Sequence, residues 1–281
     1  MLPLSVLVGV TGNVLSVVGI VLTNKYITEV DGFDFMIFLS FLHFAFTAVC
    51  MYLLLYFDFF KFAPVSFSGA MPVAVGSLLS VSLMNLNLSH NSVGFYQLSK
   101  LACIPCTLGL QKVMHNTSTS KWVKLSLVPM TLGVGIATVY DVDVNFVGIL
   151  FAACAVVATA TSQIFTSTYQ KGLDCHAMQL LYHTSPAIAL GMLVMCPFFD
   201  DVGALMQFKY SYSVCCHIAI SCCLSLGVNI SNYLVLGKTS PVTYQVLGHM
   251  KTILVIVLGI VVFKKPVVVR NIIGVVVAMV G

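Results

Sequence analysis

Charged residues are scarce in this 281-residue sequence: Asp, Glu, Lys and Arg together make up 8% of it, whereas hydrophobic residues make up 59%. Soluble domains carry about 25% charged residues, so this composition cannot supply a water-facing surface. Apolar stretches recur along the whole chain, which excludes a soluble domain held by one anchor. The formal net charge of +4 is small and dispersed, which argues against a nucleic-acid partner.

Two further features are missing from the sequence. The ten cysteines lack the spacing of a metal site or of a disulfide framework, and most lie in apolar runs, where Cys acts as a small apolar residue. We therefore expect no metal and no cofactor. The N-terminus also lacks a basic region and a cleavage site of small residues, so its first apolar stretch is expected to be a retained span rather than a signal peptide.

What the sequence does contain is a series of apolar stretches long enough to cross a bilayer, which requires about 20 apolar residues per helix. They predict an all-α integral membrane protein with about ten transmembrane helices. The connections are short and hold nearly all of the charge, so none can form a soluble catalytic domain. The predicted spans are residues 2–23, 35–57, 67–88, 92–112, 122–140, 146–170, 176–199, 211–236, 240–263 and 267–281.

An internal repeat is indicated by two Tyr-Gln pairs. Tyr96-Gln97 lies at the start of the fourth predicted span and Tyr244-Gln245 at the start of the ninth, five spans later. An odd number of spans per repeat inverts the second copy, so we predict two inverted five-helix repeats, residues 1–140 and 141–281. The last span is short for a bilayer, and we expect its helix to be incomplete within these residues.

The charge inside the predicted spans is confined to two lysines. All nine Asp and Glu fall in loops or at span ends, and only Lys100 and Lys251 of the thirteen basic residues fall near the middle of a span. A charge at the bilayer centre costs about 3 kcal/mol on insertion scales, and such residues almost always face a cavity or a partner. Because no carboxylate lies at that depth, an anionic substrate is the simplest partner. The alternative is a deprotonated or snorkelling lysine that only packs.

Each of these lysines shares a helix face with a tyrosine. Tyr96 and Lys100 are four residues apart, Tyr244 and Lys251 are seven apart, and Gly248 leaves room beside the second pair. A phenol ring near an ammonium group suits a ligand with a phosphate end and a flat or sugar end. The alternative is that both tyrosines are interfacial anchors.

The lack of carboxylates within the spans also bears on coupling. Proton- and sodium-coupled carriers usually need an intramembrane Asp or Glu, whereas an exchanger of two dianions needs none. Polar residues in other spans either line a cavity or join helices. They are Asn13, His43, Asn85, Asn87, His183, Asn229 and Asn232. An intramembrane enzyme would need a His or carboxylate cluster at the membrane face, and the histidines do not show that spacing.

Four stretches of this sequence resemble the nucleotide-sugar and triose-phosphate translocator family of the drug/metabolite transporter superfamily. They are VLTNKY at 21–26, NSVGFYQLSK at 91–100, QLLYHTSP at 179–186 and TSPVTYQVLGHMKT at 239–252. The similarity extends over nearly the whole chain. It implies ten helices in two inverted five-helix repeats, and a carrier that exchanges phosphorylated solutes by alternating access.

The resemblance also implies roles for single residues. Lys100 and Lys251 match the family's phosphate-binding lysines, and Thr252 stands where triose-phosphate members have an arginine. A Lys-Thr pair resembles the nucleotide-sugar branch, which implies a Golgi or endoplasmic reticulum antiporter, not an enzyme, that exchanges a nucleotide sugar for a nucleoside monophosphate. A plastid-type carrier of sugar phosphates or phosphoenolpyruvate is the alternative, and a homodimer stays open. The candidate substrate-binding residues are Lys100, Lys251, Tyr96, Tyr244, Thr252, Gln97, Gln245 and Asn229.

Overall fold

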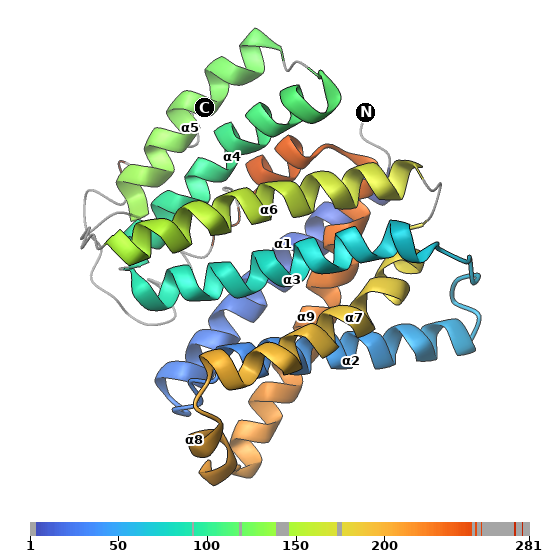
Figure 1. Ribbon diagram of the computed structural model, residues 1–281, viewed down its shortest axis with the longest axis vertical. Helices are drawn as coiled ribbons and strands as arrows, with labels where there is room; N and C mark the ends of the chain where they lie inside the picture. The colour runs from blue at the N-terminus through green and yellow to red at the C-terminus, as the bar shows by residue number, and fades with distance from the viewer. Residues whose placement is uncertain are drawn as a thin grey trace. The chain divides into compact units, whose positions relative to one another are not determined.

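The computed structural model describes residues 4–91, 93–117, 120–138, 146–172 and 176–248, together with residues 251, 254, 273 and 277. Regular secondary structure in these residues is helical throughout (Figure 1). Residues 241–248 are also helical and begin the ninth predicted span. The other helices are α1 Leu4–Glu29, α2 Met36–Tyr56, α3 Phe67–His90, α4 Val93–His115, α5 Lys121–Thr138, α6 Phe146–Gly172, α7 Ala177–Phe199, α8 Val202–Gln207 and α9 Tyr212–Lys238.

The helices agree with the first eight predicted spans, apart from two differences. Helix α1 runs to Glu29 and not to residue 23, because Lys25 and Glu29 pair across one turn at 3.8 Å and Thr28 bonds back to the carbonyl of Asn24. The short helix α8 was not predicted; it begins where the side chain of Asp201 accepts a bond from the amide of Ala204 at 3.0 Å. Most of the ninth predicted span, and all of the tenth except residues 273 and 277, lie outside the described residues.

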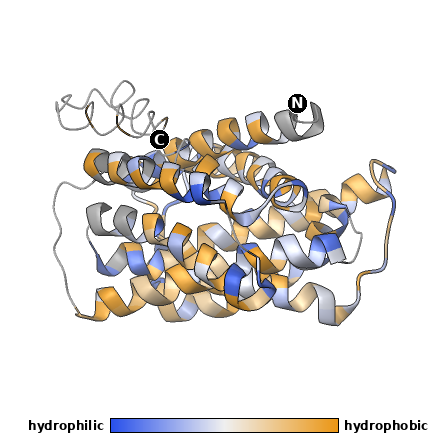
Figure 2. Cartoon of the chain, turned by 90° about the horizontal axis from the view of Figure 1, so that it is seen from above, coloured by the Kyte–Doolittle hydropathy of each residue, from blue (hydrophilic) through white to orange (hydrophobic). Residues whose placement is uncertain are grey.

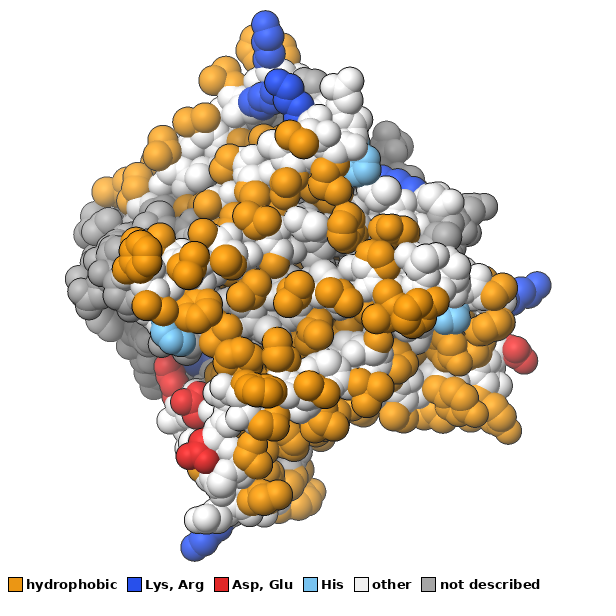
Figure 3. All heavy atoms as spheres, viewed as in Figure 1, with side chains coloured by type: hydrophobic (Ala, Val, Ile, Leu, Met, Phe, Trp, Pro, Cys, Tyr) orange, Lys and Arg blue, Asp and Glu red, His pale blue; other side chains and the backbone are white. Residues whose placement is uncertain are grey.

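Six of the described helices are long and apolar enough to cross a membrane: Gly9–Glu29 of α1, Phe67–Leu88 of α3, and all of α2, α6, α7 and α9. Much of the cartoon in Figure 2 has the colour of hydrophobic residues, and apolar side chains cover much of the face drawn in Figure 3. Helices α4 and α5 are more polar, since each contains two lysines. The chain is therefore an integral membrane protein whose described residues form only helices as regular structure, while the arrangement of ten helices in inverted repeats stays a prediction.

The chain divides into two compact units. The first unit comprises Met1–Leu78 and Phe165–Ser240, and the second comprises Leu79–Ile164 and Pro241–Gly281. Helices α3 and α6 each contribute to both units. Each unit therefore combines segments from both predicted repeats, and the boundary predicted at residues 140 and 141 stays a prediction about sequence symmetry.

The first unit is built from two helix pairs. Helix α1 packs along α9, α2 packs along α7, and α9 also contacts α2 and α7. The core contains a polar pair, because the buried hydroxyls of Thr184 and Tyr233 lie 2.9 Å apart. The remaining buried members of the core are Met51, Val73, Ala177, Leu180 and Leu181.

Helices α1 and α9 approach closely through small and polar residues. A Cβ atom added at Gly19 would lie 3.0 Å from the side chain of Leu224 on α9. The buried amide of Asn13 donates to the hydroxyl of Ser231 at 2.8 Å and to the side-chain oxygen of Asn232 at 2.7 Å. Lipid tails are as apolar as Leu, so close backbone approach and interhelical hydrogen bonds hold helices together inside a membrane.

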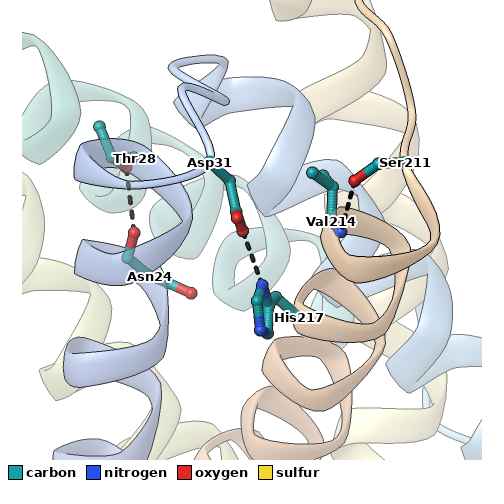
Figure 4. A network of polar contacts seen from close by, with 6 residues as sticks. All are labelled: Asn24, Thr28, Asp31, Ser211, Val214 and His217. Atoms are coloured by element: carbon teal, nitrogen blue, oxygen red, sulfur yellow. Dashed lines mark hydrogen bonds and ion pairs between the residues drawn. The ribbon is translucent and has the colours of Figure 1, made fainter.

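Acidic residues tie the connections of the first unit to neighbouring helices. The carboxylate of Asp200, which follows α7, accepts hydrogen bonds from the amides of Phe38 at 2.7 Å and Ile37 at 3.3 Å, at the start of α2. Burial raises the pKa of Asp200, while these two bonds oppose that shift. Asp31 lies 2.8 Å from Nδ1 of His217 on α9 (Figure 4). These two carboxylates therefore join helices. Both lie in connections between helices, as the sequence predicted.

The close approach of α1 and α9 generates a stability prediction. Replacing Gly19 with Leu should lower the apparent melting temperature of the purified protein by several degrees, because overpacking costs about 1–3 kcal/mol. The measurement is thermal unfolding in detergent, followed by circular dichroism.

Gly12→Leu is the matched control for this prediction, because a Cβ at Gly12 would meet no atom within 4 Å in the same helix. Equal melting temperatures for Gly19→Leu and Gly12→Leu would show that the α1–α9 contact tolerates a large side chain.

Candidate functional site

The first element of the candidate site lies on α4. Tyr96 and Lys100 are one turn apart in this helix, and the Nζ atom of Lys100 lies 4.2 Å from the centroid of the Tyr96 ring. The ring is partly buried and the lysine is exposed. A cation over a tyrosine face is stabilised by about 0.5–1 kcal/mol at exposed positions and by about 2 kcal/mol when desolvated. The sequence predicted that Tyr96 and Lys100 share a helix face, and in the structure the two side chains are in direct contact.

A second pair of the same kind lies on the helical segment that begins at residue 241. The Nζ atom of Lys251 lies 4.7 Å from the centroid of the Tyr244 ring. Lys251 is only 5% exposed, in contrast to Lys100. Both pairs belong to the second unit. The structure therefore contains two Tyr–Lys contacts of the same kind within one unit.

The carboxylates of the described residues all belong to the first unit. They are Glu29, Asp31, Asp34, Asp58, Asp200 and Asp201. Within the described part of the second unit, the positive charge is met by aromatic faces and polar groups. Lysines in such surroundings are candidates for binding an anion, since an opposite charge favours the charged form of an ammonium group.

Gln245 holds the two lysine-bearing helices together. Its Nε2 atom donates to the hydroxyl of Thr107 on α4 at 2.5 Å and to Oε1 of Gln163 on α6 at 2.9 Å. Thr107 lies seven residues after Lys100, so both share one face of α4. The segment that carries Tyr244 and Lys251 therefore packs against the Lys100 face of α4. The apolar residues of this contact are Ile104, Leu108, Leu127, Val242 and Val246.

One polar atom at this contact has no bonding partner. Gln245 is 7% exposed, and its Oε1 atom is buried without a hydrogen bond. Buried acceptors are normally bonded, and an unsatisfied one costs about 1–3 kcal/mol. Gln245 thus links its own helix to α4 and α6 through its Nε2 atom, while its Oε1 atom can still accept a hydrogen bond; we call this atom the spare acceptor.

Further polar contacts fix the start of α4. The amide of Asn87 on α3 donates to the hydroxyl of Ser99 at 2.6 Å, and that hydroxyl donates to the carbonyl of Tyr96 at 2.7 Å. Asn91 donates to the carbonyl of Gly148 on α6 at 2.9 Å. This network sets the position of the Tyr96 backbone, and Asn87 links α3 to α4 in it.

Asn229 has a different setting from the lysines. It lies on α9 in the first unit, where its amide donates to the hydroxyl of Thr47 at 3.0 Å. His43 similarly contacts Ser221 at 2.8 Å, and His183 contacts the carbonyl of Ala63 at 2.9 Å. These contacts, and those of Asn13, favour the interpretation that polar residues of the first unit join helices. A substrate role for Asn229 stays a prediction.

For two candidate residues the structure does not describe the side chain. Gln97 is part of α4, but its side chain is outside the described residues, and Thr252 is outside them altogether. Sequence reasoning missed Thr107, Gln163 and Ser99. The only signal for Thr107 was its spacing of seven from Lys100. Among the described residues, His, Cys, Asp and Glu do not gather in groups of three that could hold a metal ion.

Comparison with known proteins gives the chain a family. The Triose-phosphate Transporter family model matches residues 9–281. A UDP-xylose transporter 2 of Arabidopsis thaliana is 41% identical over 272 residues, which cover 96% of this chain and 77% of the relative. A UDP-rhamnose/UDP-galactose transporter 2 of the same plant is 37% identical over 280 residues, which cover 96% and 79%. The family and these relatives are transporters by name, and the chain belongs to the triose-phosphate transporter family.

Proposed function

We propose that this protein is a membrane antiporter that exchanges a nucleotide sugar for a nucleoside monophosphate by alternating access. The observation that carries the proposal is the pair of Tyr–Lys contacts, Tyr96–Lys100 and Tyr244–Lys251, within one unit. The names of the relatives, UDP-xylose and UDP-rhamnose/UDP-galactose transporters, support a nucleotide sugar as the cargo.

The two lysines match the charge of both cargoes. A nucleotide sugar and a nucleoside monophosphate each carry about two negative charges, so either can neutralise Lys100 and Lys251 in turn. Each charge-assisted contact to a phosphate oxygen contributes about 1.5–3 kcal/mol. The rings of Tyr96 and Tyr244 hold the two ammonium groups in place before the anion binds, which reduces the entropy lost on binding.

The same charges explain why transport would be an exchange. In this mechanism, reorientation without a cargo keeps the charges of Lys100 and Lys251 in the membrane interior without the anion that the site binds. This is unfavourable, because a charge at the bilayer centre costs about 3 kcal/mol on insertion scales. With either cargo bound, the charges cancel. An antiporter with two fixed cations therefore needs a counter-substrate and no ion gradient.

The finer assignments follow from the sequence. Thr252 in place of an arginine leaves the site with one fixed charge fewer, which favours a nucleotide sugar over a small sugar phosphate or phosphoenolpyruvate. The proposed binding residues also include Gln97, Gln245, Thr252 and Asn229. The proposed location is a Golgi or endoplasmic reticulum membrane. A homodimer is compatible with this mechanism, because both lysines come from one chain.

The exchange mechanism is tested in reconstituted liposomes. Vesicles preloaded with uridine monophosphate should take up labelled nucleotide sugar at least about tenfold faster than empty vesicles, since each 1.4 kcal/mol corresponds to a factor of ten. Strong uptake into empty vesicles under a pH gradient would contradict the proposal. A panel of nucleotide sugars and sugar phosphates in the same assay tests the cargo class.

Lys251 gives the most direct test of the site. Replacing it with Ala removes one phosphate contact and should reduce exchange at least about tenfold, with Lys100→Ala giving a comparable loss. The matched control is Lys209→Ala, an exposed lysine in the first unit that should retain the parental rate. If Lys251→Ala is folded and transports at the parental rate, the lysine is structural.

The tyrosines are tested by separating the ring from the hydroxyl. Tyr244→Phe keeps the aromatic face over Lys251 and should retain most of the exchange rate. Tyr244→Leu removes the face and should raise the half-saturating substrate concentration by about fivefold, because a partly desolvated cation–π contact contributes about 1 kcal/mol. Equal kinetics for the two variants would assign Tyr244 a packing role only.

A further inference from the structure

The end of α4 and the start of α5 each have side-chain or backbone bonds that define their local structure. Asn116 ends α4 in a left-handed conformation with φ of 51°, and the amide and hydroxyl of Thr117 both bond to the carbonyl of Gln111, at 3.4 and 3.2 Å. On the other side of the turn, the hydroxyl of Ser120 accepts a bond from the amide of Trp122 at 3.3 Å. The side chains that flank this turn are therefore displayed from ordered helix ends.

Four exposed side chains flank the turn, and together we call them the basic turn patch: Lys112 at the end of α4, and Lys121, Trp122 and Lys124 at the start of α5. Trp122 is 80% exposed. The ion pairs found among the described residues involve none of the three lysines. In Figure 3 the blue side chains at the top of the view lie over this part of the molecule, and no red side chain is drawn near them.

The surrounding sequence offers these lysines no acidic neighbour. No Asp or Glu occurs between Asp58 and Asp141. Lys121 and Lys124 lie in the first turn of α5, which contains no acidic residue, and there the positive end of the helix dipole disfavours cations. The stability of α5 therefore does not account for their position, and the charge is directed outward.

The patch continues into an apolar face of α5. Trp122, Leu125, Val128 and Leu132 recur at helical spacing and are all more than half exposed. An exposed apolar helix face in a membrane protein contacts lipid chains, and a Trp at its end lies at the level of the headgroups. The three lysines are therefore placed where phospholipid headgroups carry their charge.

We propose that the basic turn patch binds anionic phospholipid headgroups, with Lys112, Lys121 and Lys124 on the phosphates and Trp122 in the interface. Charge complementarity favours this occupant, since each lysine near an anionic membrane surface strengthens binding to that surface by roughly fivefold. A second copy of the chain would bring three further lysines against this patch, which disfavours it as the occupant. The proposal is independent of the transported cargo.

Trp122 is the only tryptophan in the 281 residues, so its fluorescence reports on this patch alone. The purified chain is reconstituted into identical mixtures of phosphatidylcholine and phosphatidylserine, with bromine carried by one lipid or the other as the quencher. At equal numbers of brominated molecules, brominated phosphatidylserine should quench the Trp122 fluorescence at least about twice as strongly as brominated phosphatidylcholine. The variant Lys121→Gln/Lys124→Gln should reduce this ratio to about one.

The matched control is Lys61→Gln/Lys209→Gln, which removes the same charge from exposed lysines of the first unit and should keep the parental ratio. Size-exclusion elution and helical circular dichroism check that each variant is folded. Equal quenching by both lipids in the parental chain would overturn the proposal and leave a simple interfacial anchor. Weak quenching by both would place a protein surface over the patch, and loss of the ratio in the control would assign it to overall charge.

Discussion

A buried lysine held against an aromatic ring is the constraint on which the rest of the candidate site depends. Lys251 is almost fully buried, and the described carboxylates belong to the first unit. The aromatic face of Tyr244 stabilises the ammonium group in part, and Lys100, held against Tyr96, is a second lysine of the same unit. In the proposed mechanism an anionic cargo binds at these lysines, so cargo recognition and the need for a counter-substrate have a single electrostatic origin.

The two units use polar residues for different purposes. In the first unit, Asn13, His43 and Asn229 bond across helices, in a solvent where burial of apolar surface contributes little to helix association. In the second unit, Gln245 also bonds across helices, but the helices that it joins are the ones that carry the lysines. Similar side chains in similar spans therefore either support the scaffold or position the site, according to what else their helix carries.

Much of this could be predicted from sequence because it depends on local spacing. Span positions follow from apolar length, and the contacts of Tyr96 with Lys100 and of Tyr244 with Lys251 follow from the helical repeat. The partners of Gln245 could not be predicted, because Thr107 and Gln163 come from two other helices and only their packing brings them near. The extension of α1 to Glu29 was missed for another reason, since charged residues end an apolar run without ending a helix.

The spare acceptor on Gln245 makes this conformation a frustrated one. Its oxygen is sealed from solvent and from donors, and a penalty of about 1–3 kcal/mol corresponds to roughly a five- to hundredfold shift in a population. A rearrangement that supplies a donor to this single atom recovers that free energy, whichever way the rest of the helix moves. Conformations that offer this atom a donor are therefore favoured over those that do not, and Gln245 links their populations to the donors that its helix meets.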